Sequence, residues 1–254
     1  MNAMWYTLRE ARNDAKGMNS GMKVQARWLC CVLIFTLLFP LCASAVEFTA
    51  YDAADARRKA LEPFRVCAFS TEYGDEDRDF MIRWKQPIRV FVNGSPNNAD
   101  LRALDAFLME LSLRVPDLPP VTRVYVRSQA NMVVNYVPMR RMGDVVPDYV
   151  DGCWGMVHFD YEDFAITNAV IGVTTDTCGQ EERNGIMREE IINGLGLCND
   201  QEDYTNSAVY QYGKSQFTVS ELDWIMLNFL YSPLLNPGDR WPEAKRKLTA
   251  FYGL

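Results

Sequence analysis

Two adjacent glutamates, Glu189 and Glu190, begin the stretch of the chain in which residue types and spacing could do chemistry. Asn193 follows Glu189 by four residues, so a helix would place these two side chains on one face. Asn199 and Asp200 come shortly afterwards. Carboxylates can act as general bases or metal ligands, and amides can hydrogen-bond a ligand. The same acids and amides can also form a hydrogen-bonded plug that stabilises a helix end.

Gly196 predicts how this stretch is folded. Residues 181–195 are expected to form a helix, and Gly196 is expected to end it in a left-handed conformation. On these residues alone, a purely structural helix end, with a glycine C-cap between two leucines, explains the pattern as well as a chemically active site does.

The other elements predict one α+β domain with a single mixed, twisted sheet packed on helices. The patterns run in the order strand, helix, several strands and then helices. Expected helices are residues 52–61 (ended by Pro63), 98–111, 181–195, 220–231 and 242–252, the fourth beginning at a capping box of Thr218 and Glu221. Expected strands are residues 82–92, 121–126, 131–137, 153–159 and 166–174.

The N-terminal region has the order of a secretory signal peptide in residues 22–45. A short basic segment is followed by about a dozen apolar residues, Pro40, and the small residues of a cleavage site, Ala43-Ser44-Ala45. The apolar run is short of the roughly 20 residues that a membrane anchor needs. A lipoprotein site at Cys42 is disfavoured by the leucine before it. We therefore expect residues 1–21 to be a gene-model extension and residues 46–254 to be the exported domain, periplasmic or secreted, with no membrane span after cleavage.

The charge of the chain argues against a nucleic-acid partner. The full sequence has 26 basic and 33 acidic side chains and a net charge of −7. Cleavage before Val46 would remove five basic and two acidic residues, which takes the net charge to about −10. Such a surface repels phosphate backbones.

Four cysteines remain after residue 45, an even number that predicts two disulfides in an oxidising compartment. We favour Cys153–Cys178, because two adjacent strands are expected between them, and this leaves Cys67–Cys198. A four-cysteine metal site is the alternative, but the sequence has no close C-x-x-C pair.

The stretch from Arg188 to Asp200 resembles the metzincin zinc-peptidase signature H-E-x-x-H-x-x-G-x-x-H-D, with every histidine replaced. In that family two histidines one helical turn apart bind zinc, the glutamate activates a zinc-bound water, and the glycine turn returns a third histidine to the metal. Carried onto this chain, the ligand positions are Glu189, Asn193 and Asn199, the general-base position is Glu190, the turn glycine is Gly196 and the trailing acid is Asp200.

Two further segments carry this resemblance. Residues 166–174 precede the helix where the family has its edge strand. Ser207–Tyr210 lies where the family's methionine turn follows, with Val209 at the position of the methionine.

The donor chemistry of the aligned positions predicts that no zinc is bound. A neutral asparagine amide is a poor zinc ligand beside imidazole or thiolate. His158 is the one histidine of the chain, so three imidazoles cannot be assembled. We therefore expect a metzincin-like domain with neither metal nor other cofactor.

A closer resemblance is to an exported bacterial family, domain of unknown function 2927. Its core E-E-x-x-Q-x-L-G-L-x-N-D corresponds to Glu189–Asp200, with Asn193 in place of the glutamine. Its S-[IAV]-[FV]-Y and L-Y-x-P-x-L-x-P-G segments correspond to Ser207–Tyr210 and Leu230–Gly238. This resemblance implies a fold and a compartment, and it implies no particular reaction.

These observations predict an exported protein that binds another protein or a cell-envelope ligand, through a cleft lined by Glu189, Glu190, Asn193, Asn199 and Asp200. The alternative is a hydrolase that uses Glu190 as its base. Its metal would be held by carboxylates at Glu189 and Asp200, with a further one from Glu202 or Asp203, a ligand set suited to calcium, magnesium or manganese.

Overall fold

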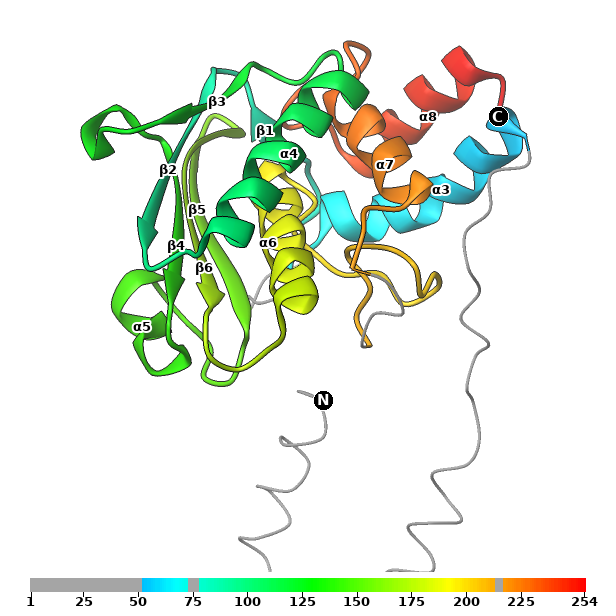
Figure 1. Cartoon of the computed structure of the whole chain (residues 1–254). Helices are drawn as coiled ribbons and strands as arrows, with labels where there is room; N and C mark the ends of the chain where they lie inside the picture. Colours follow the sequence, from blue (N-terminus) through cyan, green and yellow to red (C-terminus); the bar gives the residue numbers. More distant parts are fainter. Residues whose placement is uncertain (1–51, 73–77, 213–216) are drawn as a thin grey trace, which may run out of the picture. The chain divides into compact units, whose positions relative to one another are not determined.

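Parallel pairing dominates the sheet of this protein, as seen in a computed structural model of the chain (Figure 1). The structure describes residues 52–72, 78–212 and 217–254, which all belong to one compact unit, residues 47–254. The signal peptide expected at residues 22–45 and the extension expected at residues 1–21 lie outside the described residues.

The sheet has six strands in the described part of the chain and is mixed. Its order is β1-β6-β4-β2-β3, with every neighbouring pair parallel, and β5 pairs antiparallel with β6. The strands are β1 Arg83–Trp84, β2 Ile88–Gly94, β3 Val121–Val124, β4 Met132–Val137, β5 Gly155–Glu162 and β6 Ala165–Thr174. The domain is therefore a mixed α/β domain with a mostly parallel sheet.

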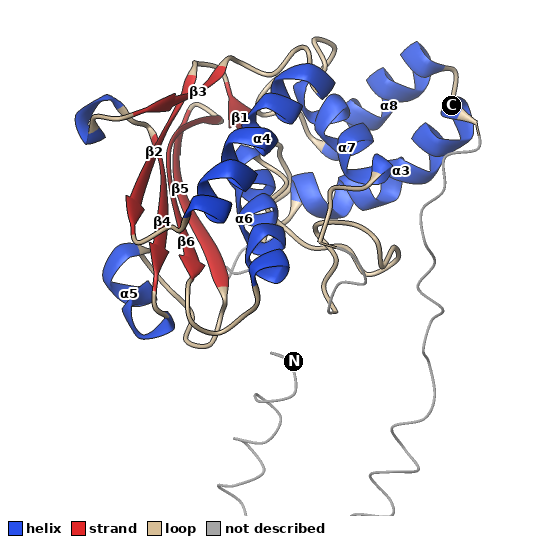
Figure 2. Ribbon diagram, in the orientation of Figure 1, coloured by secondary structure: helices blue, strands red, loops and turns tan. Residues whose placement is uncertain are grey.

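Helices cover both faces of the sheet and form a separate group beside it (Figure 2). On β6, Ile171 packs toward α6, whereas the next residue, Gly172, packs against Met142 and Val146 of α5 and its C-cap. Successive residues of a strand point to opposite faces, so α6 and α5 cover opposite faces. The helices are α3 Ala53–Phe69, α4 Asn98–Arg114, α5 Met142–Val145, α6 Gln180–Leu195, α7 Glu221–Tyr231 and α8 Trp241–Tyr252.

Two expected element boundaries are wrong, both near a proline. Pro63 does not end the first helix, which continues to Phe69. A proline inside a helix costs ~3 kcal/mol, but Phe64 and the residues after it on the same face are buried against α7 and α8. Burying one large apolar side chain offsets about 1.5–3 kcal/mol of this cost. The strand expected at residues 82–92 is divided into β1 and β2, with Pro87 between them.

Two further expectations about the second half of the chain are also wrong. Residues 166–174 are not at the sheet edge, because β6 pairs with β5 and also with β1 and β4. The capping box of α7 consists of Ser220 and Asp223, not Thr218 and Glu221. Asp223 fits because its short side chain accepts from both the backbone N–H and the hydroxyl of Ser220.

The structure does not support the expected disulfides, because none of Cys67, Cys153, Cys178 and Cys198 is joined to another cysteine. Thr174 N donates to the carbonyl of Trp154, the residue after Cys153. Thr174 therefore lies opposite the beginning of β5, and Cys178 follows later in the chain. Cys67 and Cys198 are close, because Asn199 N donates to the Cys67 carbonyl at 3.2 Å. The Cys198 thiol instead donates to the carbonyl of Asn193 at 3.6 Å.

Candidate functional site

The C-terminus of α6 ends in a turn built around Gly196. Gly196 has a φ of 122°, and its N–H bonds the carbonyl of Asn193 while Leu197 N–H bonds that of Ile192. This pair of hydrogen bonds is the Schellman motif, which needs a residue with positive φ. A β-carbon at Gly196 would lie 2.4 Å from the carbonyl oxygen of Ile82. The position therefore requires glycine both for its conformation and for its space.

Side chains from two other elements satisfy the last carbonyls of α6. The indole Nε1 of Trp84 donates to Gly194 O at 2.8 Å. The hydroxyl of Tyr231 donates to Leu195 O at 2.7 Å and accepts from the N–H of Trp84. Burial raises the pKa of Tyr231, so this hydroxyl stays protonated as a donor. The helix end is thus locked between β1 and α7, which fixes where the residues on both sides of Gly196 lie.

Glu190 and Asn193 are both buried on α6, each with about 7% of its surface exposed. A β-carbon built on Gly155, at the start of β5, would lie 2.5 Å from Glu190 Oε1. Glu190 therefore packs directly against the backbone of the sheet. Asn193 Oδ1 is buried and has no hydrogen-bond partner among the described residues. Glu189 is more exposed than either of these residues.

Asn199 and Asp200 lie in the loop after Gly196, which is tied to the end of α3. Asn199 Nδ2 donates to Ser70 Oγ at 2.7 Å, and Asn199 Oδ1 accepts from Asp200 N at 2.8 Å. Asp200 is buried close to Cys67. Burial raises the pKa of the Cys67 thiol well above its usual value, and the charge of Asp200 adds to the rise. Both polar groups of the Asn199 amide are thus engaged within the protein.

A buried carboxylate that the sequence analysis missed, Asp223, holds the next segment. Asp223 Oδ1 accepts from Ser207 Oγ at 2.5 Å, and Oδ2 accepts from Ala208 N at 2.9 Å. Burial raises the pKa of Asp223, and hydrogen bonds from Ser207, Ala208 and Ser220 offset part of that rise. The S-x-x-D spacing of residues 220–223 was the signal that could have identified it. Residues 207–210, where Val209 is fully buried, are thereby fixed to α7.

The comparison with protein families gives a match over most of the chain. The model of the family described as "Protein of unknown function (DUF2927)" matches residues 57–250. The chain belongs to this family. The match extends from α3 into α8. It therefore includes all the candidate residues at the end of α6, which together are called the α6 site: Glu189, Glu190, Asn193, Asn199 and Asp200. The search of curated proteins returned no match.

The donor groups of this DUF2927 domain do not fit a zinc site. Asn199 is engaged by Ser70 and Asp200 N, and Glu190 is packed against Gly155. Within residues 52–72, 78–212 and 217–254, no three His, Cys, Asp or Glu side chains converge as metal ligands would. His158 lies on β5, 3.5 Å from Asp148 and 3.6 Å from Asp160.

One carboxylate of the alternative metal site, that of Glu202, is engaged by another side chain. Glu202 Oε1 accepts from the hydroxyl of Tyr212 at 2.6 Å. The backbone N–H of Asp203 donates to Gln201 Oε1 at 2.9 Å, in a turn that Gln201 organises. In the described part of this DUF2927 domain, no helix is both long and apolar enough to cross a membrane.

Proposed function

We propose that this protein is an exported binding protein, built on a metzincin-like scaffold whose zinc chemistry has been lost. One observation carries the proposal: at two of the aligned positions, Asn199 and Glu190, the polar group is engaged inside the protein. Asn199 is tied to the end of α3, and Glu190 is packed against β5. A metallopeptidase would need these groups free to bind metal and water.

The resemblance to a metzincin site is supported by the local geometry of α6. Glu190 and Asn193 lie on the helix, Gly196 has the positive φ that redirects the chain, and Asn199 and Asp200 follow. Export is supported by the sequence pattern of residues 22–45. The acidic net charge of the domain is a separate observation, and it argues against nucleic acid as a partner.

The surface proposed for binding is the outer edge of β5, next to α6. Among the described residues β5 pairs only with β6, so its other side offers unpaired backbone N–H and C=O groups. An extended segment of a partner can add to such an edge as a further strand. Asp160 and Glu162 are exposed on this strand, so a basic segment is favoured.

A titration with an extended basic peptide tests binding and catalysis together. The probe is a ten-residue peptide of alternating arginine and valine, and its control has prolines in place of the valines, which cannot donate to a strand ladder. We expect the first peptide to bind and to remain intact by mass spectrometry after prolonged incubation, and the control to bind much more weakly.

Two outcomes would contradict the proposal. Cleavage of the peptide, lost in Glu190→Gln, would favour the hydrolase with a carboxylate metal site. Equal binding of the two peptides would show that charge alone is recognised, and the β5 edge would no longer be the binding surface.

A further inference from the structure

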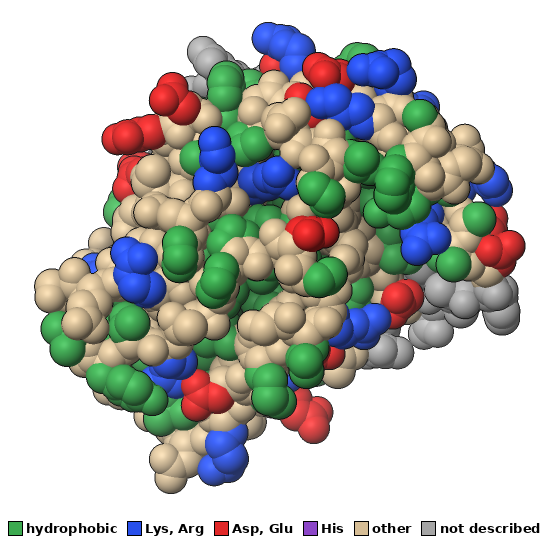
Figure 3. Space-filling view, turned by 90° about the horizontal axis from the view of Figure 1, so that it is seen from above, with side chains coloured by type: hydrophobic (Ala, Val, Ile, Leu, Met, Phe, Trp, Pro, Cys, Tyr) green, Lys and Arg blue, Asp and Glu red, His purple; other side chains and the backbone are tan. Residues whose placement is uncertain are grey.

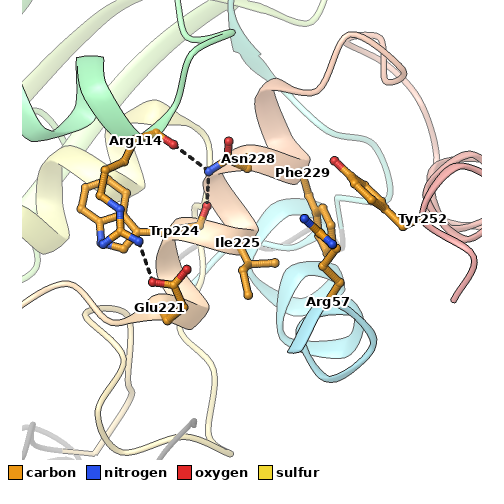
Figure 4. A pocket seen from close by; sticks show the side chains of 8 residues that line it. All are labelled: Arg57, Arg114, Glu221, Trp224, Ile225, Asn228, Phe229 and Tyr252. Atoms are coloured by element: carbon orange, nitrogen blue, oxygen red, sulfur yellow. Dashed lines mark hydrogen bonds and ion pairs between the residues drawn. The ribbon is translucent and has the colours of Figure 1, made fainter. Parts of the chain in front are cut away.

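A second candidate site lies away from α6, in a hollow across the exposed side of α7 (Figure 4). Its volume is about 270 Å³. Pockets for drug-sized ligands measure about 300–1,000 Å³, so a hollow of this volume suits a smaller ligand, on the scale of a single amino acid. It is lined by Arg57, Arg114, Glu221, Trp224, Ile225, Asn228, Phe229 and Tyr252, none of which belongs to the α6 site.

The floor of the hollow is apolar and comes from α7. Ile225 is half-buried there, while Phe229 is buried and packs against Phe64 of α3 with 5.5 Å between ring centroids. A small apolar group that covers this floor removes apolar surface from water, which favours binding. The hollow is therefore suited to an apolar body rather than to a free inorganic ion.

Each end of the hollow carries an arginine stacked on an aromatic ring. Arg57 lies over Tyr252 and Arg114 lies over Trp224, both with the guanidinium carbon 4.8 Å from the ring centroid. Figure 4 shows the two pairs on opposite sides of Ile225. A guanidinium stacked in this way keeps its in-plane N–H groups available to a carboxylate. Stacking also restricts the side chain, so less rotamer entropy is lost on binding.

The two arginines differ in what they already bind. Arg114 donates to Glu221 Oε2 at 2.5 Å, so that pair is neutral overall. Arg57 has no ion pair within the described residues, whereas its neighbours Arg58 and Lys59 pair with Asp55. The hollow therefore has one uncompensated positive charge. On the face seen from above in Figure 3, Lys and Arg side chains are interspersed with Asp and Glu side chains.

We propose that this hollow binds a single carboxylate attached to a compact apolar body, with Arg57 as the residue that binds the carboxylate. The chemistry is that of an apolar amino acid with a blocked amine, which can be a free small acid or the C-terminal residue of a peptide. One net positive charge selects one carboxylate, and the apolar floor of Ile225 and Phe229 covers the side chain. This site goes beyond the binding function proposed for β5 and does not depend on it.

The test uses N-acetyl-phenylalanine as the probe and its C-terminal amide as the uncharged control. The indole N–H signal of Trp224, assigned with Trp224→Phe, reports occupancy of the hollow by NMR. We expect a saturable shift with Kd on the order of 1 mM, given the few atoms in contact. The amide should bind at least tenfold more weakly. A tripeptide ending in phenylalanine separates the two sources, since tighter binding identifies a peptide end and equal binding identifies a free acid; both results support the site.

Two variants of α3 give the matched comparison. Arg57→Gln should weaken binding of the acid about tenfold or more and leave binding of the amide unchanged. Arg65→Gln, which removes an exposed charge paired with Glu62 on the same helix, should change neither. Ile225→Trp should fill the hollow and abolish the shift, and thermal melts of all variants establish that they are folded.

The proposal is overturned in three ways. One is no saturable shift of Trp224 up to about 10 mM acid. Another is equal affinity for acid and amide. The third is unchanged affinity in a folded Arg57→Gln protein.

Discussion

Replacing Gly196 by alanine should destabilise the domain by about 2–5 kcal/mol, and the structure separates this cost into two parts. The first is conformational, because an L-residue at a φ of 122° costs about 1–2 kcal/mol. The second is steric, because the new β-carbon would lie 2.4 Å from the Ile82 carbonyl oxygen. This oxygen belongs to the backbone, so relief requires a main-chain shift, and such overpacking costs about 1–3 kcal/mol.

Gly152→Ala is the matched control for the conformational part. Gly152 has a φ of 100°, but a β-carbon there would meet no atom within 4 Å. For a domain of this size, thermal melts should show Tm lowered by roughly 5–15 °C in Gly196→Ala and by only a few degrees in Gly152→Ala. Equal Tm losses in the two variants would refute the steric argument. A Tm for Gly196→Ala at or above that of the wild type would refute the turn itself.

Three other predictions concern titration, thiols and export. Burial raises the pKa of Asp223, so the folded state binds more protons than the unfolded state, and the contribution of Asp223 to stability grows as pH falls from 7 toward roughly 4. In urea melts, the difference in stability between wild type and Asp223→Asn should grow over that range. A constant difference would contradict the prediction. In the folded, reduced protein Cys178 should be alkylated before Cys67, because Cys67 is fully buried and burial raises its thiol pKa more than that of Cys178. Mass spectrometry of partially labelled protein measures the order, and equal rates would contradict the prediction. Protein recovered from the periplasm or medium should begin near Val46 by N-terminal sequencing, and an intact N-terminus there would contradict export by cleavage.

The sequence predicted the elements with strong local signals and failed where distant contacts decide. The helix at residues 181–195 has its own apolar spacing and a glycine end, and α6 is Gln180–Leu195. The helix through Pro63 could not be anticipated, because its stability comes from burial of Phe64 against elements more than 150 residues away. Local turn chemistry alone predicts a break there.

The candidate site shows the same division. Spacing alone placed Glu190 and Asn193 on one helix and Gly196 at its end. Spacing could not reveal that Glu190 packs on Gly155 or that Asn199 bonds Ser70, because both contacts depend on how α6 docks on β5 and α3. The prediction of two disulfides is not supported for a related reason. A count of cysteines does not show whether two of them are close in space with their sulfur atoms directed at each other.

The metal content of the native protein is the most direct test of the proposal that zinc chemistry has been lost. Protein purified without chelators and dialysed against metal-free buffer should contain zinc well below one equivalent by elemental analysis, because the aligned positions provide one carboxylate and two amides. It should also leave unstructured peptides intact. Zinc near one equivalent, together with a peptide-cleaving activity that Glu190→Gln abolishes, would contradict the proposal.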